Sequence, residues 1–382
     1  METNRFAKFV PARLTQAREA RGYTLSQLSE AVGISHQAIS KYENNLSQPS
    51  FDMLEKISDT LNMPVTFFFK PISVSKEGVV FFRSGAMTSV KSKNVHKHKL
   101  NWVRDIHLYL EQFLNFPAIN VPRIIQREYF IATPDEEIDR VAAELRRSWN
   151  LGNGPISNVS LLMEKNGVIV SRSPSSSYSI DACSIWEDGE RPYVLLSDDK
   201  TGPRSRFDIA HELGHLVLHS KLKQSEFNQK QNYKIIEREA NRFAGAFLLP
   251  EQSFGSEIYS SSLEYFISLK MRWKISIQAM AYRAHSLGVL TEYQHIYLRQ
   301  KLAKQNQLTK EPLDEKIDFE EPLALRQAIV ALVDHNVKTR QDILTDLRLA
   351  REEIEQFSNL DNGYFLEQSA QANIVSFKPK SK

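Results

Sequence analysis

The sequence predicts a mostly α-helical protein with a small β component, divided into two or three domains. Helical spacing of apolar residues fills the N-terminal part of the 382-residue chain, and short strand-like runs alternate with helices in its middle. Further helical spacing follows after residue 322. With 41% hydrophobic and 25% charged residues, the composition is that of a globular protein, which excludes a wholly disordered chain.

The composition also excludes several classes of protein. Cys183 is the single cysteine, so the chain forms no intrachain disulfide and no cysteine-rich zinc cluster. No apolar run reaches the roughly 18 residues of a membrane helix, and no signal-type core follows the first residues. We therefore expect a soluble, cytoplasmic protein without a membrane partner. The net charge of +3 is too small to indicate nucleic-acid binding by itself.

Four short helices are expected between residues 9 and 61. Gly22 closes the first helix, and Thr24, Ser35 and Ser50 precede the other three as N-caps. Gly33 permits a tight turn between the second and third helices. Their inner faces are formed by apolar residues at helical spacing, namely Val10, Leu14, Ala17, Leu25, Leu28, Val32, Ala38, Ile39, Tyr42, Met53, Leu54, Ile57 and Leu61.

The segment Leu28–Asn44 resembles the helix-turn-helix of the XRE, or phage-repressor, family. The resemblance covers roughly residues 9–68 and depends on Gly33 and on the closing Tyr42-Glu43-Asn44. It implies that the third helix enters the major groove of a double-stranded DNA operator, and paired half-sites imply a homodimer. The residues then expected to contact DNA are Thr24, Leu25, His36, Gln37, Ser40 and Lys41.

The charge of this domain is modest for a DNA-binding protein. Residues 1–71 carry eight basic and seven acidic side chains, so affinity would depend on dimerisation or on basic residues nearby. The alternative is a small helical unit that mediates protein contacts. Residues 91–99 contain four lysines and two histidines, and we interpret them either as a solvated linker or as an auxiliary arm that contacts phosphates. His96 and His98 alternate as strand residues do, but no metal site is expected there.

The region after this basic segment is predicted to mix helices and strands. Thr133 caps a helix with Pro134 in its first turn, and Glu136 completes a capping box. Short strands are expected near residues 78–83, 168–170 and 193–196, and a further helix from Trp102 to Phe113. A serine-rich loop at 174–179 is of the kind that borders a site.

The clearest chemical motif is His211-Glu212-Leu213-Gly214-His215. Histidines at i and i+4 project from one face of a helix and can bind one metal ion, while Glu212 lies where it can act on a metal-bound water. The motif is embedded in an apolar helical surface that would bury it, formed by Phe207, Ile209, Ala210, Leu213, Gly214 and Val217. A catalytic zinc ion needs a third protein ligand and one open position.

Three residues are candidates for the third ligand. His219 continues the i+4 series, but helical twist carries it about 80° away from His211. Glu237 and Asn241 are i and i+4 on a second predicted helix, so that one can bind the metal while the other orients a histidine of the first helix. We favour Glu237 as the ligand and keep Glu239 and His219 as alternatives.

The motif around His211, followed by Glu237-x-x-Ala240-Asn241 and Leu248-Leu249-Pro250, resembles the ImmA/IrrE family of metallo-endopeptidases over about residues 138–300. The resemblance implies an α+β, zincin-like (gluzincin) domain. In it His211, His215 and Glu237 bind Zn²⁺, with Mn²⁺ as an alternative, and Glu212 is the general base. Members of the family occur beside or fused to XRE domains and cleave or otherwise inactivate a repressor.

The expected function is therefore a DNA-binding regulator whose peptidase domain cleaves itself or a partner repressor after a signal. Two alternatives are a transcription factor with a non-proteolytic zinc or ligand sensor, and a toxin–antitoxin component that sequesters a partner protein. Besides zinc, Arg206, Tyr178 or a residue beyond Pro250 would stabilise the oxyanion, although Arg206 is equally suited to pair with Asn241 or Asp208.

The remaining sequence predicts helices that support the peptidase core, a polar linker and a helical C-terminal module. The expected organisation is a DNA-binding domain at 1–71, a connector at 72–134, the peptidase domain at 135–303, a linker at 304–322, and the C-terminal module and tail at 323–382.

Overall fold

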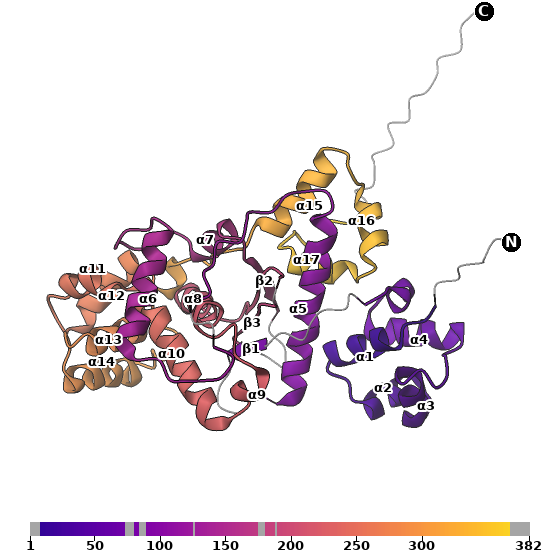
Figure 1. Ribbon diagram of the computed structural model, residues 1–382, viewed down its shortest axis with the longest axis horizontal. Coiled ribbons are helices and arrows are strands. Elements are labelled where there is room, and N and C mark those ends of the chain that lie inside the picture. Colours follow the sequence, from indigo (N-terminus) through magenta and orange to yellow (C-terminus); the bar gives the residue numbers. More distant parts are fainter. Residues whose placement is uncertain are drawn as a thin grey trace, which may run out of the picture.

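The computed structural model describes residues 8–72, 80–83, 89–124, 127–174, 180–187 and 189–366. Within these ranges the chain is mostly helical, with one four-stranded mixed sheet in its middle (Figure 1). The predicted fold class is confirmed: an all-helical N-terminal domain is followed by an α+β region and then by C-terminal helices.

The N-terminal domain, called the head below, consists of α1 (Pro11–Ala20), α2 (Leu25–Val32), α3 (His36–Glu43), α4 (Phe51–Leu61) and the 3₁₀ helix η1 (Val65–Phe69). The three predicted N-caps are confirmed, because Thr24, Ser35 and Ser50 each accept a hydrogen bond from a backbone N–H three residues later. Gly33 has φ +76°, the left-handed conformation that the turn between α2 and α3 requires.

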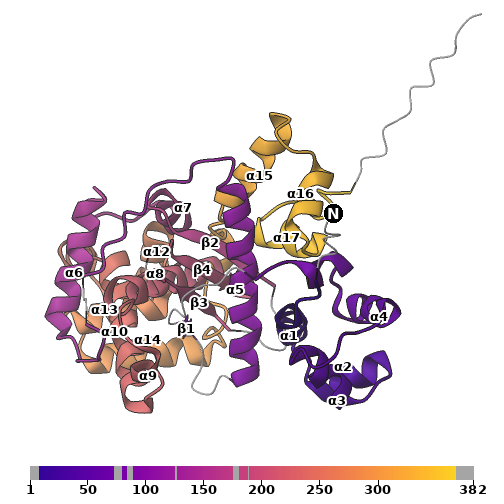
Figure 2. The same ribbon diagram turned by 45° about the vertical axis from the view of Figure 1, so that its right-hand side comes forward.

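The basic segment is part of a long helix rather than a linker. Helix α5 (Val90–Leu110) includes the whole segment and most of the helix predicted from Trp102 to Phe113, and it stands between the head and the sheet (Figures 1 and 2). The side chains of His96 and Lys99 are buried, and Lys99 Nζ donates a hydrogen bond to Ser173 Oγ at 2.8 Å. The interpretations of this segment as a solvated linker and of His96 and His98 as strand residues are therefore wrong.

The sheet has the strand order β1-β3-β4-β2. Its strands are β1 (Val80–Arg83), β2 (Ile169–Ser173), β3 (Ala182–Ile185) and β4 (Tyr193–Ser197). β3 pairs antiparallel with both β1 and β4, whereas β2 and β4 are parallel. Successive side chains point to opposite faces, so that Ala182 belongs to the apolar cluster that includes residues of α8, while Cys183 belongs to the cluster that includes residues of α5. The sequence did not predict β3.

The helices of the middle region are α6 (Asp135–Ser148), α7 (Val159–Lys165), α8 (Gly202–Leu218), α9 (Gln224–Phe227), α10 (Lys230–Leu248), α11 (Glu251–Phe254), η2 (Gly255–Glu257), α12 (Leu263–Trp273), α13 (Ile277–Ser286) and α14 (Glu292–Lys304). The predicted Thr133 cap is wrong. Pro134 occupies the N-cap position of α6 without a side-chain hydrogen bond, and the Thr133 N–H instead donates to Glu239 Oε1 at 2.8 Å.

The predicted linker is fastened to the middle region. It contains η3 (Asp314–Lys316), and Lys270 Nζ, which is fully buried, donates to Glu311 at 2.9 Å and to Asp314 at 2.5 Å. The C-terminal module follows as α15 (Ala324–Asp334), α16 (Arg340–Leu347) and α17 (Arg351–Phe357). An ion pair between Glu353 and Arg21 ties the module to the head.

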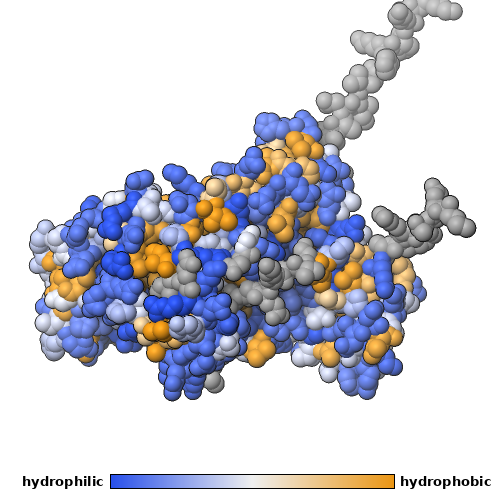
Figure 3. All heavy atoms as spheres, in the orientation of Figure 1, coloured by the Kyte–Doolittle hydropathy of each residue, from blue (hydrophilic) through white to orange (hydrophobic). Residues whose placement is uncertain are grey.

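The face of the molecule that is seen in Figure 3 is mostly hydrophilic, with separate small apolar patches. Of the helices in the described ranges, none combines the length and the apolar character that crossing a membrane requires.

Candidate metal centre and DNA-reading surface

The close packing of α8 against α10 forms the candidate metal centre, called the metal centre below. Gly214 makes this approach possible, since a Cβ atom at this position would lie 3.2 Å from the backbone of Ala240. The Nε2 atoms of His211 and His215 are 3.0 Å apart, and they lie 3.5 and 3.3 Å from the two carboxylate oxygens of Glu237. Among the described residues, these three side chains form the one group of histidine and acidic residues that can hold a metal ion.

The donor geometry fits a zinc ion. Ligand atoms placed tetrahedrally at 2.0–2.1 Å from zinc are about 3.3 Å apart, which is close to the separations between the atoms of His211, His215 and Glu237. Both histidines use their other ring nitrogen elsewhere. His211 Nδ1 is 3.0 Å from Asn241 Oδ1, and His215 Nδ1 is 3.1 Å from His219 Nδ1. Each Nε2 is thereby directed at the space that Glu237 faces.

The other two candidate ligands lie together behind His215. His219 Nε2 is 3.1 Å from Glu239 Oε2, and the second oxygen of Glu239 accepts the Thr133 N–H. Both side chains are almost fully buried, at 2% and 1% exposure. The structure therefore brings Glu237, rather than Glu239 or His219, to the two histidines. Asn241 lies where an orienting residue is predicted.

The Glu212 carboxyl group is held at one oxygen and free at the other. Its Oε2 accepts a hydrogen bond from Ser184 Oγ at 2.5 Å, whereas Oε1 is buried without a hydrogen-bond partner among the residues that the structure describes. Burial raises the pKa of Glu212 to about 7. The sequence did not indicate Ser184 because it lies on the unpredicted strand β3.

Strand β1 supplies two further residues that sequence analysis missed. The Phe81 ring stacks on His215 with centroids 4.8 Å apart, and Arg83 pairs with Asp208 at 3.1 Å, one helical turn before His211. Burial, with a smaller contribution from the Arg83 charge, lowers the pKa of His211 to about 3, so the ring is neutral as a metal ligand must be. No local signal marks these contacts, because they arise from strand pairing.

The expected roles of Arg206 are not supported. Its guanidinium is buried and contacts Glu320 and the carbonyl oxygens of Ile156 and Ser157, so both pairings predicted for it, with Asn241 and with Asp208, are wrong. Arg206 therefore connects helix α8 to the predicted linker. Tyr178 lies outside the described residues.

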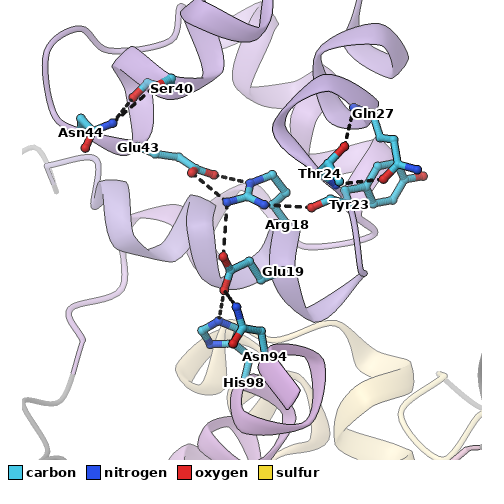
Figure 4. A network of polar contacts seen from close by, with 10 residues as sticks. All are labelled: Arg18, Glu19, Tyr23, Thr24, Gln27, Ser40, Glu43, Asn44, Asn94 and His98. Atoms are coloured by element: carbon cyan, nitrogen blue, oxygen red, sulfur yellow. Dashed lines mark hydrogen bonds and ion pairs between the residues drawn. The ribbon is translucent and has the colours of Figure 1, made fainter. Parts of the chain in front are cut away.

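The residues predicted to contact DNA lie at the start of α2 and on α3, and their side chains are exposed or half-buried. Thr24, His36, Gln37 and Lys41 are exposed, and Leu25 and Ser40 are half-buried. The Ser40 carbonyl accepts a hydrogen bond from Asn44 Nδ2 at 2.8 Å, and Thr24 forms a capping box with Gln27 (Figure 4).

A polar network holds α3 beneath this surface (Figure 4). Arg18 donates to both oxygens of Glu43, at 2.7 and 3.0 Å, and also to the Tyr23 carbonyl at 2.8 Å. The neighbouring Glu19 contacts α5, where Asn94 Nδ2 and His98 Nε2 lie 3.1 and 2.9 Å from its Oε2. Helix α3 is thus fixed to α1, and α1 to α5.

The helical head and the buried histidine pair define a DNA-binding transcriptional regulator that carries a peptidase-like domain. In particular, residues 14–68 match the helix-turn-helix family model, and residues 163–285 match the model of the IrrE N-terminal-like domain, peptidase family M78. The chain therefore carries an XRE-type helix-turn-helix domain and an M78 peptidase-like domain.

Two transcriptional regulators are similar to this chain over short stretches. The transcriptional regulator SutR of Escherichia coli (strain K12) is 40% identical over 65 residues, which are 17% of this chain and 36% of SutR. SinR of Bacillus subtilis (strain 168) is 41% identical over 54 residues, which are 14% of this chain and 49% of SinR. The chain thus spans about a third to a half of these relatives. A Mycobacterium tuberculosis transcriptional regulator aligns with 17% identity and a TM-score of 0.29, over 48% of this chain and 51% of that chain.

Proposed function

We propose that the M78 domain is a zinc-dependent endopeptidase and that this regulator uses it to cleave a partner repressor, or itself, after a signal. The observation that carries the proposal is the placement of Glu212 beside the cluster of His211, His215 and Glu237. One oxygen of Glu212 is held and the other is free, as a general base requires.

The three clustered side chains would hold the metal. Two imidazoles and one carboxylate are a donor set of catalytic zinc sites, which keep one position open. Zn²⁺, or Mn²⁺ as an alternative, would supply Lewis acidity towards a peptide carbonyl and lower the pKa of a coordinated water to about 7. Asn241 would act as a positioning residue by holding the His211 ring.

Glu212 would perform the proton transfers of peptide hydrolysis. Its Oε1 takes a proton from water as the water oxygen bonds to the scissile carbonyl carbon, and it returns that proton to the amide nitrogen as the C–N bond breaks. Ser184 keeps the carboxyl group in place through Oε2. Phe81 covers the His215 ring and shields this side of the site from solvent.

The head would direct the regulator to its operator. The α3 helix would lie in the major groove, where Gln37 can pair bidentately with adenine and Lys41 can donate to guanine. Thr24 and Leu25, at the start of α2, would meet a phosphate, and two heads of a homodimer would read paired half-sites.

The experiment is to incubate the zinc-loaded protein, alone and with candidate repressors, and to identify fragments by mass spectrometry. Glu212→Gln should abolish cleavage but preserve zinc content and DNA binding. If regulation in cells survives this substitution unchanged, the peptidase proposal fails and a non-proteolytic metal sensor is favoured. Co-purification of a small partner protein, without fragments, would instead favour sequestration.

A further inference from the structure

A groove of about 420 Å³ runs between α10 and α13 and includes Glu237, one of the three clustered side chains. Glu237, Asn241 and Gly245 follow one another at four-residue spacing along α10, and all three line this groove. Eight residues of helix rise about 12 Å. Lys234, three residues before Glu237, also lines the groove, which therefore passes the Glu237 carboxylate and extends two helical turns beyond it.

Small side chains provide the room in this groove. A Cβ atom at Gly245 would approach nothing closer than Arg283 Cδ at 3.7 Å, and Ala279 lines the facing helix. The wall on α13 also carries Tyr282, which is 56% exposed at the rim. These dimensions suit an extended polypeptide, whereas a DNA duplex is far too wide to enter between two helices.

The walls of the groove carry an excess of positive charge. Four cations line it, namely Lys234, Arg238, Arg242 and Arg283. Two carboxylates of α6 are shared among the three arginines. Asp135 pairs with Arg242 at 2.8 Å and with Arg238 at 3.3 Å, and Asp139 pairs with Arg242 at 2.8 Å and with Arg283 at 3.1 Å.

Two of these cations are accessible to a ligand. The Lys234 side chain is exposed and makes no ion pair with the described residues, and the Arg238 side chain is 53% exposed. They lie four residues apart, and therefore one helical turn apart on the same face of α10. The remaining acid of the groove, Glu237, belongs to the metal centre and would be neutralised by a bound cation.

A second cavity, of about 350 Å³, meets the groove at Phe207 and Ala279. Its three cations, Arg83, Lys200 and Arg204, are half-buried. Two of them are paired, since Arg83 contacts Asp208 at 3.1 Å and Lys200 contacts Asp181 at 2.7 Å. The exposed cations of the two cavities are therefore those of the groove between α10 and α13, Lys234 and Arg238.

We propose that the groove between α10 and α13 binds an acidic stretch of the polypeptide substrate, next to the scissile bond. Lys234 and Arg238 would pair with its carboxylates, and Tyr282 would pack against its backbone or an apolar side chain. The inference deepens the proposed peptidase function, but binding in the groove requires no catalysis and is tested without it.

The experiment uses the full-length Glu212→Gln chain loaded with Zn²⁺, so that bound peptide is not cleaved. Two fluorescein-labelled probes share a Gly/Ser framework and differ only in six glutamates or six lysines. Binding is measured by fluorescence anisotropy at low and high salt. We expect the glutamate probe to bind at least tenfold more tightly than the lysine probe, and salt to weaken its binding.

Charge reversal of the groove tests where the acidic probe binds. Lys234→Glu combined with Arg238→Glu should weaken its binding at least tenfold. The matched control is Arg147→Glu combined with Lys165→Glu, because both residues are exposed, neither lines the groove and the net charge changes equally. The control should bind as the parent does. Lys234→Gln with Arg238→Gln should show an intermediate loss, with little risk to folding.

Several outcomes would overturn the inference: unchanged binding in both groove variants, an equal loss in the control, or tighter binding of a single-stranded oligonucleotide than of the glutamate probe at the same residues. Failure of the peptidase proposal has a different signature, since wild-type protein would then cleave nothing while the groove still bound the acidic probe. If the protein cleaved neutral peptides but did not bind the glutamate probe, only the proposal for the groove would be refuted.

Discussion

The metal centre and the DNA-reading surface place their functional residues in opposite environments. His211, Glu212 and His215 have no exposed surface, whereas Gln37 and Lys41 lie open to solvent on α3. In the candidate metal centre both histidines and one oxygen of Glu212 have a defined neighbour in the protein. On α3 the exposed side chains would find their partners only on bound DNA.

This difference determines how substitutions should act. A change in the buried centre leaves polar groups without partners, so its effect spreads to neighbours and to the metal. A change on the exposed surface would remove only the contact with DNA that we predict for that residue. The exposed surface nevertheless depends on a buried layer, since Arg18 and Glu43 fix the orientation of α3.

The largest effect is expected for Glu237→Ala. Loss of a residue that only orients a metal ligand lowers metal affinity by up to about a hundredfold. Loss of one of the three ligands themselves should therefore lower zinc affinity by more than this. Zinc content after dialysis against a competing chelator measures this. Glu239→Ala is the matched comparison, because it removes a buried carboxylate that reaches His215 only through His219, and it should lower zinc affinity less than Glu237→Ala does. Full zinc occupancy in Glu237→Ala would point to His219 or Glu239 as the ligand.

The second prediction concerns the layer beneath the DNA-reading surface. Arg18→Ala leaves Glu43 without its two hydrogen bonds and should destabilise the head by about 2 to 4 kcal/mol, because both side chains are about nine-tenths buried. Hydrogen exchange of the α1–α4 amides measures the local loss. Zinc affinity should not change, and a parallel loss of zinc would show that the two regions are not independent.

The third prediction separates specificity from stability at the exposed surface. Gln37→Ala should weaken binding to the operator by about 1 to 3 kcal/mol and leave hydrogen exchange in the head unaltered. Lys41→Ala should act similarly, with a stronger effect at guanine positions. Titration of operator and scrambled duplexes at fixed salt measures both. An equal loss on the two duplexes would mean that Gln37 contacts the DNA backbone rather than a base.

The features that sequence analysis predicted are those encoded within one or two helices. The caps of α2, α3 and α4 need only a side chain and an N–H three residues away. The i and i+4 spacings of the histidines on α8, and of Glu237 and Asn241 on α10, determine which side chains share a helix face. Packing of α8 on α10 then brings these faces together.

The features it missed depend on contacts between distant segments. Ser184 reaches Glu212 because β3 pairs with both β1 and β4, and nothing within β3 itself indicates this. The lysine-rich part of α5 was misinterpreted because its composition is that of a solvated surface. The buried position of Lys99 arises only from its hydrogen bond to Ser173 and from packing on the sheet. Arg206 similarly finds its partner, Glu320, 114 residues along the chain.

The smallest effect tests α5, where the two regions meet. His107 is buried on this helix, with Nδ1 3.0 Å from Tyr193 Oη, and burial lowers its pKa to about 3. The unfolded chain takes up this proton near the ordinary histidine pKa of about 6.5. Between these values the unfolded state binds more protons, so stability falls as the pH decreases, by about 1 to 2 kcal/mol between pH 7 and pH 5.

His107→Gln should remove this part of the acid sensitivity even if the variant is less stable at pH 7. Urea unfolding at pH 7 and pH 5, followed separately in the head and in the middle region, gives the difference in unfolding free energy between the two pH values for each protein. His36→Gln on the exposed face of α3 is the control and should retain the wild-type difference. If both variants lose stability equally on acidification, His107 does not couple α5 to pH. If His107→Gln alters the acid sensitivity of the head alone, α5 unfolds together with the head and not with both regions.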